Sequence, residues 1–300
     1  MTASEELIVA SDRIEATLLP GVGGRLHALR VDGRDLLRTP DTASRHAREP
    51  FHWGAYPMAP WCNRIAAGET VVRGRRIALE PNFDDGTVIH GQVFLARWDV
   101  AGDSRLVVSG GGDGWPWTYT VTLDASATES ELELRYRLRN TSDDPMPAGL
   151  GIHPWFTKPL AVRIPADRAF RTNIDQPAHP EPVDGPFDLR QLREMPPDLD
   201  ATWTDLTEPI VELHRVDLGV GVRIQFSKTA AYVVAASPSG LDAVAVEAQT
   251  HAPNGLGRLL GGEPGALEWL DPGDALELDV RLVVDDGGRP RASPPHEAGG

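Results

Sequence analysis

The sequence predicts an all-β fold, a large β-sandwich of antiparallel sheets. Residues 131–139 and 276–282 alternate charged and apolar side chains with the period of two that marks a half-buried strand. No segment shows a sustained helical stripe, and 30 glycines and 26 prolines are spread through the chain, as many turns require. With 300 residues and no shift in composition, we expect one large domain over residues 1–284.

Shorter strand-like runs follow one another along the chain, and turn residues such as Asp32-Gly33 and Pro272-Gly273 stand between many of them. These runs are 14–19, 25–31, 71–79, 98–100, 105–109, 119–123, 146–153, 210–216, 220–226 and 232–236. Short helical turns are expected at 188–194 and 254–260. Residues 173–205, rich in Pro, Asp and His, are predicted to form a long irregular segment, of a kind that is usually functional or mobile. Residues 285–300 are predicted to be a disordered tail.

Charge and cysteine content narrow the classes of function. The formal net charge is -15, and no basic cluster offsets it, which disfavours binding to nucleic acid or to an anionic membrane. The single cysteine, Cys62, cannot form an intrachain disulfide. The N-terminus carries acids where a signal peptide has basic residues, and no long apolar run follows, so we expect a cytoplasmic protein.

Ionisable side chains occur in three segments made mostly of apolar and small residues. Arg64 lies within Pro60-Trp61-Cys62-Asn63-Arg64-Ile65, and His90 lies within Ile89-His90-Gly91. His153 follows the strand-like run 146–152 and precedes Pro154, which lacks an N–H and is expected to stop strand pairing there. Glu247 closes the nearly apolar run 241–246. Such groups in apolar surroundings are usually held by a partner or bind a ligand.

Each of these residues has a structural and a chemical interpretation. His153 is either a core histidine bonded to a carbonyl or, with an ordinary pKa of about 6.5, a proton donor or acceptor near neutrality. Glu247 is either a strand-end salt bridge to an arginine or a general base whose pKa burial has raised. Arg64 offers five fixed donors. Asp200 and Asp205 flank Trp203, a pattern that can hold a sugar hydroxyl while the ring stacks.

Other chemistries lack their usual residues. The glycine-rich stretch 110–114 has no lysine and no following helix, so it is predicted to be a loop and not a phosphate cradle. No serine lies in a Gly-x-Ser-x-Gly elbow, and Cys62 has no recognisable nucleophile motif. No closely spaced pair of histidines indicates zinc. We therefore expect neither a metal nor a cofactor.

Taken together, four segments resemble the aldose 1-epimerase family, also called galactose mutarotases. They are Pro60 to Gly68, His90-Gly91, His153-Pro154-Trp155-Phe156, and Glu247-Ala248-Gln249-Thr250 with Pro253-Asn254 after it, and the likeness spans roughly residues 14–284. The resemblance implies a galactose mutarotase-like β-supersandwich. It also implies that the protein interconverts the α and β anomers of a free monosaccharide, without a cofactor.

The resemblance also implies roles for single residues. Glu247 would be the general base and His153 the general acid, facing one another across a sugar-sized gap. His90 and Arg64 would bind substrate oxygens, and Asn63 and Trp155, in the matched segments, are counted with them. An aspartate would hold sugar hydroxyls; Asp200 matches best, with Asp205 as the alternative.

One departure from the family pattern bears on which sugar is bound: the histidine is followed by Pro154-Trp155-Phe156-Thr157, where members acting on galactose often carry a Tyr-Phe-Asn-Leu-like run.

Two other functions stay open. A hexose-phosphate 1-epimerase would need basic residues around the phosphate, for which Arg97 and the arginines of residues 45–48 are the candidates. The third possibility is a non-catalytic protein that binds or senses a sugar.

Overall fold

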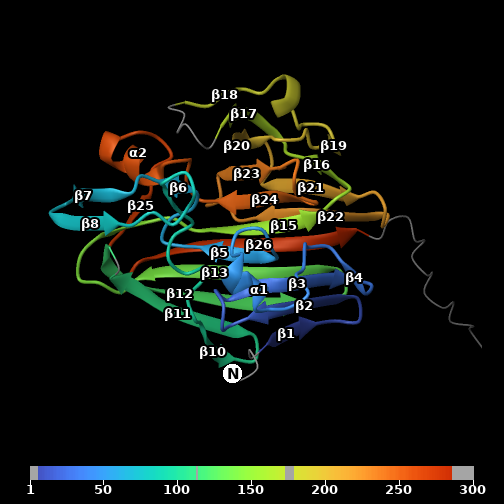
Figure 1. Ribbon diagram of the computed structural model, residues 1–300, viewed down its shortest axis with the longest axis horizontal. Coiled ribbons are helices and arrows are strands. Elements are labelled where there is room, and N and C mark those ends of the chain that lie inside the picture. Colours follow the sequence, from blue (N-terminus) through green and yellow to red (C-terminus); the bar gives the residue numbers. More distant parts are fainter. Residues whose placement is uncertain (1–5, 113, 173–178, 286–300) are drawn as a thin grey trace, which may run out of the picture.

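Two large antiparallel β-sheets form the body of the molecule (Figure 1). The computed structural model describes residues 6–112, 114–172 and 179–285. Within this part of the chain one sheet has 11 strands and the other has 9, and three two-stranded ribbons add to them. The all-β prediction is confirmed.

The spatial order of the strands differs from their order in the sequence. From one edge to the other, the first sheet contains β1 (Leu7–Ala10), β2 (Ile14–Leu19), β3 (Arg25–Val31), β5 (Ala55–Met58), β15 (Gly151–Thr157), β24 (Ala243–Gln249), β23 (Tyr232–Ala236), β20 (Asp200–Leu206), β17 (Ala166–Phe170) and β18 (Glu181–Pro182), with β4 (Arg34–Asp35) paired to β3. The second contains β10 (Asp99–Gly102), β11 (Arg105–Gly112), β12 (Trp115–Ala127), β13 (Glu131–Asn140), β26 (Ala275–Asp285), β22 (Val220–Phe226), β21 (Ile210–Arg215), β16 (Leu160–Arg163) and β19 (Arg193–Glu194). The ribbons pair β6 (Arg64–Ile65) with β9 (Val88–Ile89), β7 (Gly68–Val72) with β8 (Arg75–Leu79), and β14 (Met146–Ala148) with β25 (Glu268–Leu270).

Alternating apolar and charged residues determine which side chains of the second sheet are buried. In β13 the apolar residues Leu132, Leu134, Tyr136 and Leu138 are buried, while the charged residues between them face outward or lie at the surface. β13 pairs with β26 so that Leu134 lies opposite Val280. Leu134 and Val280 face the same apolar space as Ile152 and Val246 of the first sheet, so the core lies between the two sheets.

β24 is buried on both faces, and this sets it apart from β13. Val244 and Val246 pack into the core between the sheets, whereas Ala243 and Ala245 belong to a second apolar cluster, with Tyr56 among its members. Because side chains of a strand alternate between faces, the second cluster lies on the outer face of the first sheet. The continuous apolar run before Glu247 thus reflects a strand covered on both sides.

The helices are short and lie in the connections. α1 (Arg45–Arg48) and the 3-10 turn η1 (Gly185–Phe187) were not predicted, and the short helix expected at 188–194 is wrong, because that stretch contains β19. α2 (Gly255–Gly261) confirms the helical turn expected at 254–260; the side chain of Asn254 caps its N-terminus by accepting from the Gly257 N–H. In Figure 1, α2 lies beside the β7–β8 ribbon at one end of the molecule.

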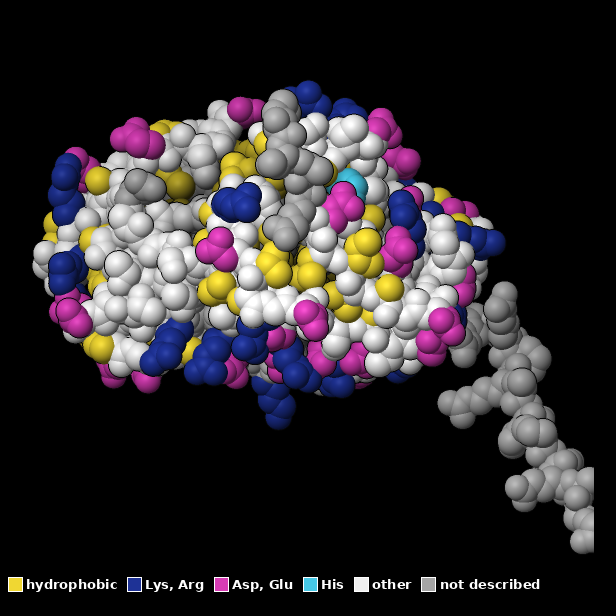
Figure 2. Space-filling view, turned by 90° about the horizontal axis from the view of Figure 1, so that it is seen from below, with side chains coloured by type: hydrophobic (Ala, Val, Ile, Leu, Met, Phe, Trp, Pro, Cys, Tyr) yellow, Lys and Arg dark blue, Asp and Glu magenta, His cyan; other side chains and the backbone are white. Residues whose placement is uncertain are grey.

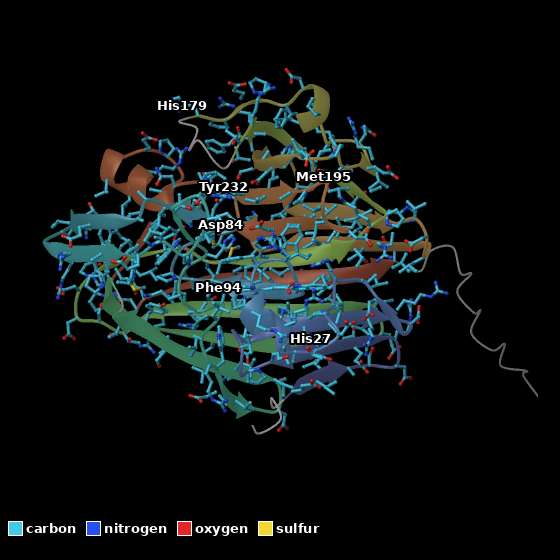
Figure 3. The ribbon with its side chains drawn as sticks, in the orientation of Figure 1. His27, Asp84, Phe94, His179, Met195 and Tyr232 are labelled. Carbon is cyan, nitrogen blue, oxygen red and sulfur yellow. The ribbon has the colours of Figure 1, made fainter. Side chains whose placement is uncertain are left out.

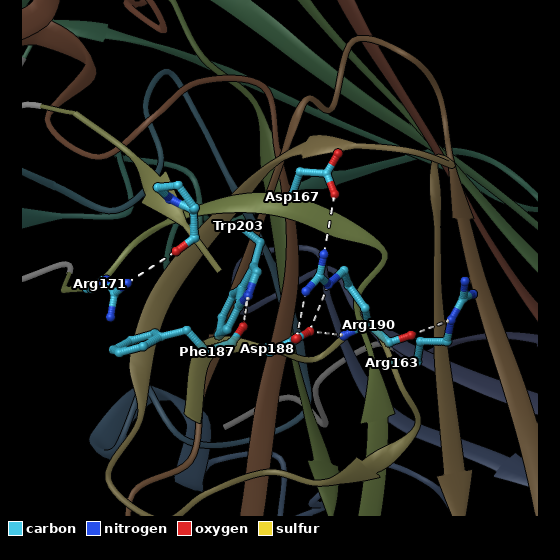
Figure 4. Close-up of polar contacts among 8 residues, drawn as sticks. Arg163, Asp167, Arg171, Phe187, Asp188, Arg190 and Trp203 are labelled. Atoms are coloured by element: carbon cyan, nitrogen blue, oxygen red, sulfur yellow. Dashed lines mark hydrogen bonds and ion pairs between the residues drawn. The ribbon is translucent and has the colours of Figure 1, made fainter. Parts of the chain in front are cut away.

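The described part of 173–205 is more ordered than expected. β18, η1, β19 and the start of β20 lie in it, and residues 173–178 are outside the described residues. Figure 4 shows why the segment before β20 is fixed: the indole of Trp203 donates to the Phe187 carbonyl at 2.8 Å, and the guanidinium of Arg190 binds the Asp188 carboxylate at 2.7 Å. The contact of Trp203 with Phe187 joins residues 16 positions apart, and such a partner cannot be predicted from local composition.

The surface mixes charges of both signs. On the face seen in Figure 2, Lys and Arg side chains are interspersed with Asp and Glu. Ion pairs on the surface of the molecule include those of Arg30 with Glu15 and with Asp35. None of the helices in the described residues is long and apolar enough to cross a membrane. Asp285 ends β26, and the predicted disordered tail otherwise lies outside the described residues.

Candidate active site

A cavity of about 180 Å³ lies on the outer face of the first sheet. It is lined by all of the residues predicted to act on a sugar: Asn63, Arg64, His90, His153, Trp155, Asp200 and Glu247. Five of them lie on β6, β15, β20 and β24, which are spread widely along the sequence, while Asn63 directly precedes β6 and His90 directly follows β9. The alternative aspartate, Asp205, does not line the cavity, and neither do the phosphate-binding candidates Arg97 and the arginines of residues 45–48.

The cavity floor follows from strand alternation. Glu247 shares its face of β24 with Ala243 and Ala245, the side opposite the core between the sheets. On β15, His153 and Trp155 share one face by the same rule, and both line the cavity.

His153 and Glu247 contact each other directly. The β15–β24 register places Ile152 opposite Ala248 and Trp155 opposite Ala245, which brings His153 level with Glu247 on the neighbouring strand. Nε2 of His153 lies 3.1 Å from Oε1 of Glu247, and the two side chains are 7% and 3% exposed. The expected sugar-sized gap between them is therefore wrong, because directly opposed residues on paired strands are within contact distance.

Two further details of these strands differ from expectation. Pro154 does not end the strand: the predicted run 146–153 divides into β14 and β15, and β15 continues to Thr157 because its pairing with β24 resumes at Trp155. Glu247 is not a salt bridge to an arginine, since its carboxylate contacts His153 and Gln249. Both side chains are thus held inside strands and not at strand ends.

Gln249 fixes the other oxygen of the Glu247 carboxylate. Its Nε2 donates to Oε2 of Glu247 at 2.7 Å, and Gln249 is fully buried two residues further along β24, on the same face. Burial raises the pKa of Glu247 well above its ordinary value; the hydrogen bond from Gln249 opposes this, and the nearby charge of Asp200 adds to it.

Aromatic rings hold the imidazole of His153. Tyr56 stacks on it with 4.6 Å between ring centroids, Trp155 lies at 5.1 Å, and His90 meets it edge-on at 5.0 Å. The Phe51 carbonyl in turn accepts hydrogen bonds from both the Tyr56 hydroxyl and the Trp155 indole. Burial lowers the pKa of His153 well below its ordinary value, and His90 and His52 contribute in the same direction.

These opposed shifts leave one proton for the pair near neutrality. Because the pKa of Glu247 is raised, the carboxyl group keeps the last proton of the pair as the pH rises. Because the pKa of His153 is lowered, the imidazole does not add a second proton until the pH is well below neutrality. The 3.1 Å contact allows that proton to lie on either group. The arrangement can therefore present a base and an acid side by side.

Arg64 is positioned at the rim by the loop after β8. Its Nε donates to Oδ2 of Asp85 at 2.7 Å, and its guanidinium lies 5.2 Å from the ring centroid of Phe83. Asp85 also accepts from the Thr87 backbone N–H at 3.0 Å. One edge of the guanidinium is thus used within the protein, which leaves the terminal nitrogens as the donors that can reach a ligand.

The backbone around Asn63 and His90 is left-handed. Asn63 has φ 54° and His90 has φ 64°, and the His90 N–H donates to the Asn63 carbonyl at 3.1 Å. Gly91 follows with φ 74°, and a Cβ there would lie only 2.0 Å from the Ala59 carbonyl oxygen. Burial lowers the pKa of His90 well below its ordinary value, so its imidazole is neutral near pH 7.

His251 ties the segment that begins at Pro60 to the end of β24. Its Nε2 accepts from the Cys62 N–H at 2.9 Å, and its Nδ1 lies 2.7 Å from the Ala252 carbonyl oxygen. Because a carbonyl can only accept, the proton of the neutral imidazole is on Nδ1. Burial lowers the pKa of His251 to about 4, which keeps it in this neutral form.

The tryptophan beside Asp200 does not stack on a ligand. Trp203 is fully buried in the core and donates to the Phe187 carbonyl, so the expected pairing of an acid with a stacking Trp203 is wrong. Alternation along β20 explains this, since Asp200 and Trp203 lie an odd number of residues apart. Trp155 is the indole that lines the cavity.

Sequence reasoning missed several residues of the site: Phe51, His52, Tyr56, Phe83, Asp85 and Gln249. Gln249 carried a usable signal, because it is the second polar residue of a strand that is otherwise apolar. The others lie in segments of ordinary composition, and only tertiary contacts reveal them. Among the described residues, no group of three or more His, Cys, Asp or Glu side chains is arranged to hold a metal ion.

Comparison with known proteins places the chain in a family. The family model described as aldose 1-epimerase matches residues 8–256. The chain belongs to the aldose 1-epimerase family. No curated protein matches its sequence.

Solved structures resemble this member of the aldose 1-epimerase family over nearly its whole length. A galactose mutarotase-like protein from Clostridium acetobutylicum is 18% identical with a TM-score of 0.81, covering 93% of this chain and 94% of that one. The GalM/aldose epimerase homologue from C. elegans is 17% identical with a TM-score of 0.78, covering 94% and 99%. At these identities the likeness establishes the fold, the galactose mutarotase-like sandwich.

Proposed function

We propose that this member of the family is an active aldose 1-epimerase that interconverts the α and β anomers of a free aldose. Glu247 acts as the general base and His153 as the general acid. The observation that carries this proposal is the 3.1 Å contact between Oε1 of Glu247 and Nε2 of His153 at the floor of the cavity. The two oxygens that must exchange a proton, O1 and the ring oxygen, are bonded to the same sugar carbon, so an adjacent base and acid match them.

The reaction needs only proton transfers. Glu247, as carboxylate, removes the proton from the O1 hydroxyl while His153, as imidazolium, protonates the ring oxygen. The bond between C1 and the ring oxygen breaks, its electron pair stays on that oxygen, and C1 becomes an aldehyde. After rotation about the C1–C2 bond the groups act in reverse and close the ring on the other face. The pair begins and ends with one proton in total, as the opposed pKa shifts favour.

The remaining lining residues divide the work of binding. Arg64, Asn63 and His90 offer donors and acceptors from the β6–β9 side of the cavity, and Asp200 offers a carboxylate from β20. Trp155 provides a flat apolar surface of the kind that packs against the C–H face of a pyranose. A ring held between these walls is oriented with C1 toward the floor.

The charges of the cavity favour an uncharged sugar over a sugar phosphate. Arg64 is the one arginine among the described residues that line the cavity, and it is already paired with Asp85. Asp200 and Glu247 add acidic groups. A phosphate would therefore meet more negative than positive groups, which disfavours the hexose-phosphate alternative.

Polarimetry tests the proposal. Freshly dissolved α-glucose, α-galactose and other free aldoses should approach rotational equilibrium faster with the protein present, and sugar 6-phosphates should not. Glu247→Gln should abolish the acceleration, whereas Glu277→Gln, which removes an exposed glutamate paired with Arg137, should retain it. Unchanged rates for every sugar, together with saturable sugar binding, would support the non-catalytic binding protein instead.

A further inference from the structure

A buried arginine lies behind the cavity wall, and no carboxylate of the described residues pairs with it. Arg25, on β3, is fully buried. Its Nη1 donates to the Pro50 carbonyl at 3.0 Å and lies 3.1 Å from Nδ1 of His46, and its Nη2 donates to the Phe94 carbonyl at 2.9 Å. Burial lowers the pKa of Arg25 to about 10, so it remains a cation near neutrality. Buried charges are usually neutralised by an ion pair, whereas these three acceptors are neutral.

The hydrogen bonds of Arg25 fix the protonation of two histidines. A guanidinium can only donate, so Nδ1 of His46 accepts and its proton is on Nε2. That Nε2 then donates to Nδ1 of His27, 2.9 Å away. Burial first, and then the charge of Arg25, lower the pKa of His46 to about 3. The His46 imidazole therefore stays neutral near pH 7. Figure 3 labels His27 on β3 and Phe94, which mark the two ends of the network.

Arg25 contacts the ring that supports the proposed acid. Its guanidinium carbon lies 5.0 Å from the centroid of the Tyr56 ring, and the Tyr56 ring stacks on His153 at 4.6 Å. The cation is therefore within about 10 Å of the His153 ring, and both groups contact the same aromatic ring. Through the Pro50 carbonyl, Arg25 also holds the chain next to Phe51, whose own carbonyl binds Tyr56 and Trp155.

We propose that Arg25 is a positioning residue for the Glu247–His153 pair: its guanidinium fixes the Tyr56 ring on which His153 stacks and places an unneutralised positive charge behind the pair. The catalytic consequence rests on the proposed function. The other ionisable groups that face the pair come from each element packed against it: His52, Tyr56 on β5, Cys62, Arg64 on β6, His90 after β9 and Asp200 on β20.

The charge has a consequence that a purely structural role lacks. A cation behind the pair disfavours both of its protonation steps, so removal of the cation should move both limbs of the pH–rate profile to higher pH. At a separation of about 10 Å and an effective dielectric constant of about 20, the expected move is about one pH unit. A site that merely loosens and admits water would instead lower the pKa of Glu247 and raise that of His153, which moves the limbs in opposite directions.

The test uses the full chain and four variants. Arg25→Gln removes the cation, Arg25→Lys keeps it, and His46→Glu leaves Arg25 in place but neutralises it with an adjacent carboxylate. Arg30→Gln removes an exposed arginine from the same strand and is the matched control. The pH dependence of kcat/KM by polarimetry and the side-chain NMR titration of His153, assigned by its loss in His153→Asn, are measured for each folded variant.

We expect both limbs and the His153 titration to rise by about one unit in Arg25→Gln and His46→Glu, and to stay in place in Arg25→Lys and Arg30→Gln. Limbs of the pH–rate profile that keep their positions, or that move toward each other, in Arg25→Gln would overturn the proposal. If Arg25→Gln does not fold, His46→Glu decides by the same criterion. If the wild-type protein shows no mutarotation, the proposed function fails, and the NMR titration alone decides the role of Arg25.

Discussion

At the scale of the residue, the hydrogen bond from Gln249 to Glu247 determines how readily the proposed base loses its proton. The 2.7 Å contact favours the ionised carboxylate and so opposes the upward pKa shift caused by burial. Gln249→Met should remove this bond, raise the pKa of Glu247 and move to higher pH the basic limb of the pH–rate profile, where the pair loses its last proton. A hydrogen bond to a charged group is worth about 1.5–3 kcal/mol, which corresponds to roughly one to two pH units.

The polarimetric pH profile checks this expectation. Activity of Gln249→Met should persist to higher pH than activity of the wild-type protein. A basic limb at the wild-type position would show that Gln249 does not act on the ionisation of Glu247.

Two aspartates of β20 form a matched pair for testing substrate contacts. Asp200 lines the cavity, whereas Asp205, on the same strand, does not. Asp200→Asn should raise KM about tenfold, because an ionised acceptor for sugar hydroxyls becomes a neutral amide. Asp205→Asn should leave KM and kcat unchanged, since asparagine also tolerates the left-handed backbone at φ 54°. Equal effects of the two substitutions would contradict the assignment of Asp200 to the sugar.

At the scale of the element, His251 makes the segment after Pro60 sensitive to acid. The folded-state pKa of about 4 lies below the ordinary 6.5, so the folded protein binds fewer protons than the unfolded chain between these values. Its contribution to stability is complete above about pH 6.5, is lost as the pH falls toward 4, and amounts to at most about 3 kcal/mol. His46, with a pKa of about 3, contributes in the same direction.

Urea unfolding between pH 4 and 7 tests this account of His251. The free energy of unfolding of the wild-type protein should fall as the pH is lowered over that range, and the fall should be shallower in His251→Gln. A pH dependence identical in the two proteins would mean that His251 does not titrate with folding.

The same scale shows how far the sequence predicts the elements. The alternation of apolar and charged residues correctly predicted β13 and β26. A strand with one solvent-exposed face shows this alternation in its own sequence. β5, β16 and β17 were missed because they are short and their pairing partners lie far away in the chain. Strand pairing also continued past Pro154, since the neighbouring residues re-form the ladder.

Some features of the candidate site could be predicted from the sequence and others could not. Ionisable residues embedded in apolar sequence, together with family resemblance, pointed to residues that do share one cavity. Their mutual distances could not be predicted, because the direct contact of His153 with Glu247 depends on the register of two strands about a hundred residues apart. Tyr56 and Arg25 were missed because their importance comes from ring and cation contacts formed only after folding.

At the scale of the whole molecule, the main core and the proposed active site lie on opposite faces of the first sheet. The main core lies between the two sheets, and the cavity lies on the outer side. Leu134→Ala should therefore lower the free energy of unfolding by about 2–5 kcal/mol and leave kcat/KM of the folded protein unchanged. Urea denaturation and polarimetry measure the two quantities.

The same denaturation curve tests whether residues 1–284 form one domain. Because both sheets share this core, we expect a single transition that moves as a whole in Leu134→Ala. Two separated transitions, or a parallel loss of kcat/KM, would contradict this division of the molecule.

The central claim, that Glu247 and His153 work as one proton-exchanging pair, is tested most directly by a double-mutant comparison of mutarotation rates. Two groups that act as a unit lose their joint contribution when either is removed. Glu247→Gln and His153→Gln should each reduce kcat/KM severely, and the double variant should be no slower than the slower single variant. Losses that multiply in the double variant, as independent sites would give, or a single variant with wild-type rates, would contradict the account.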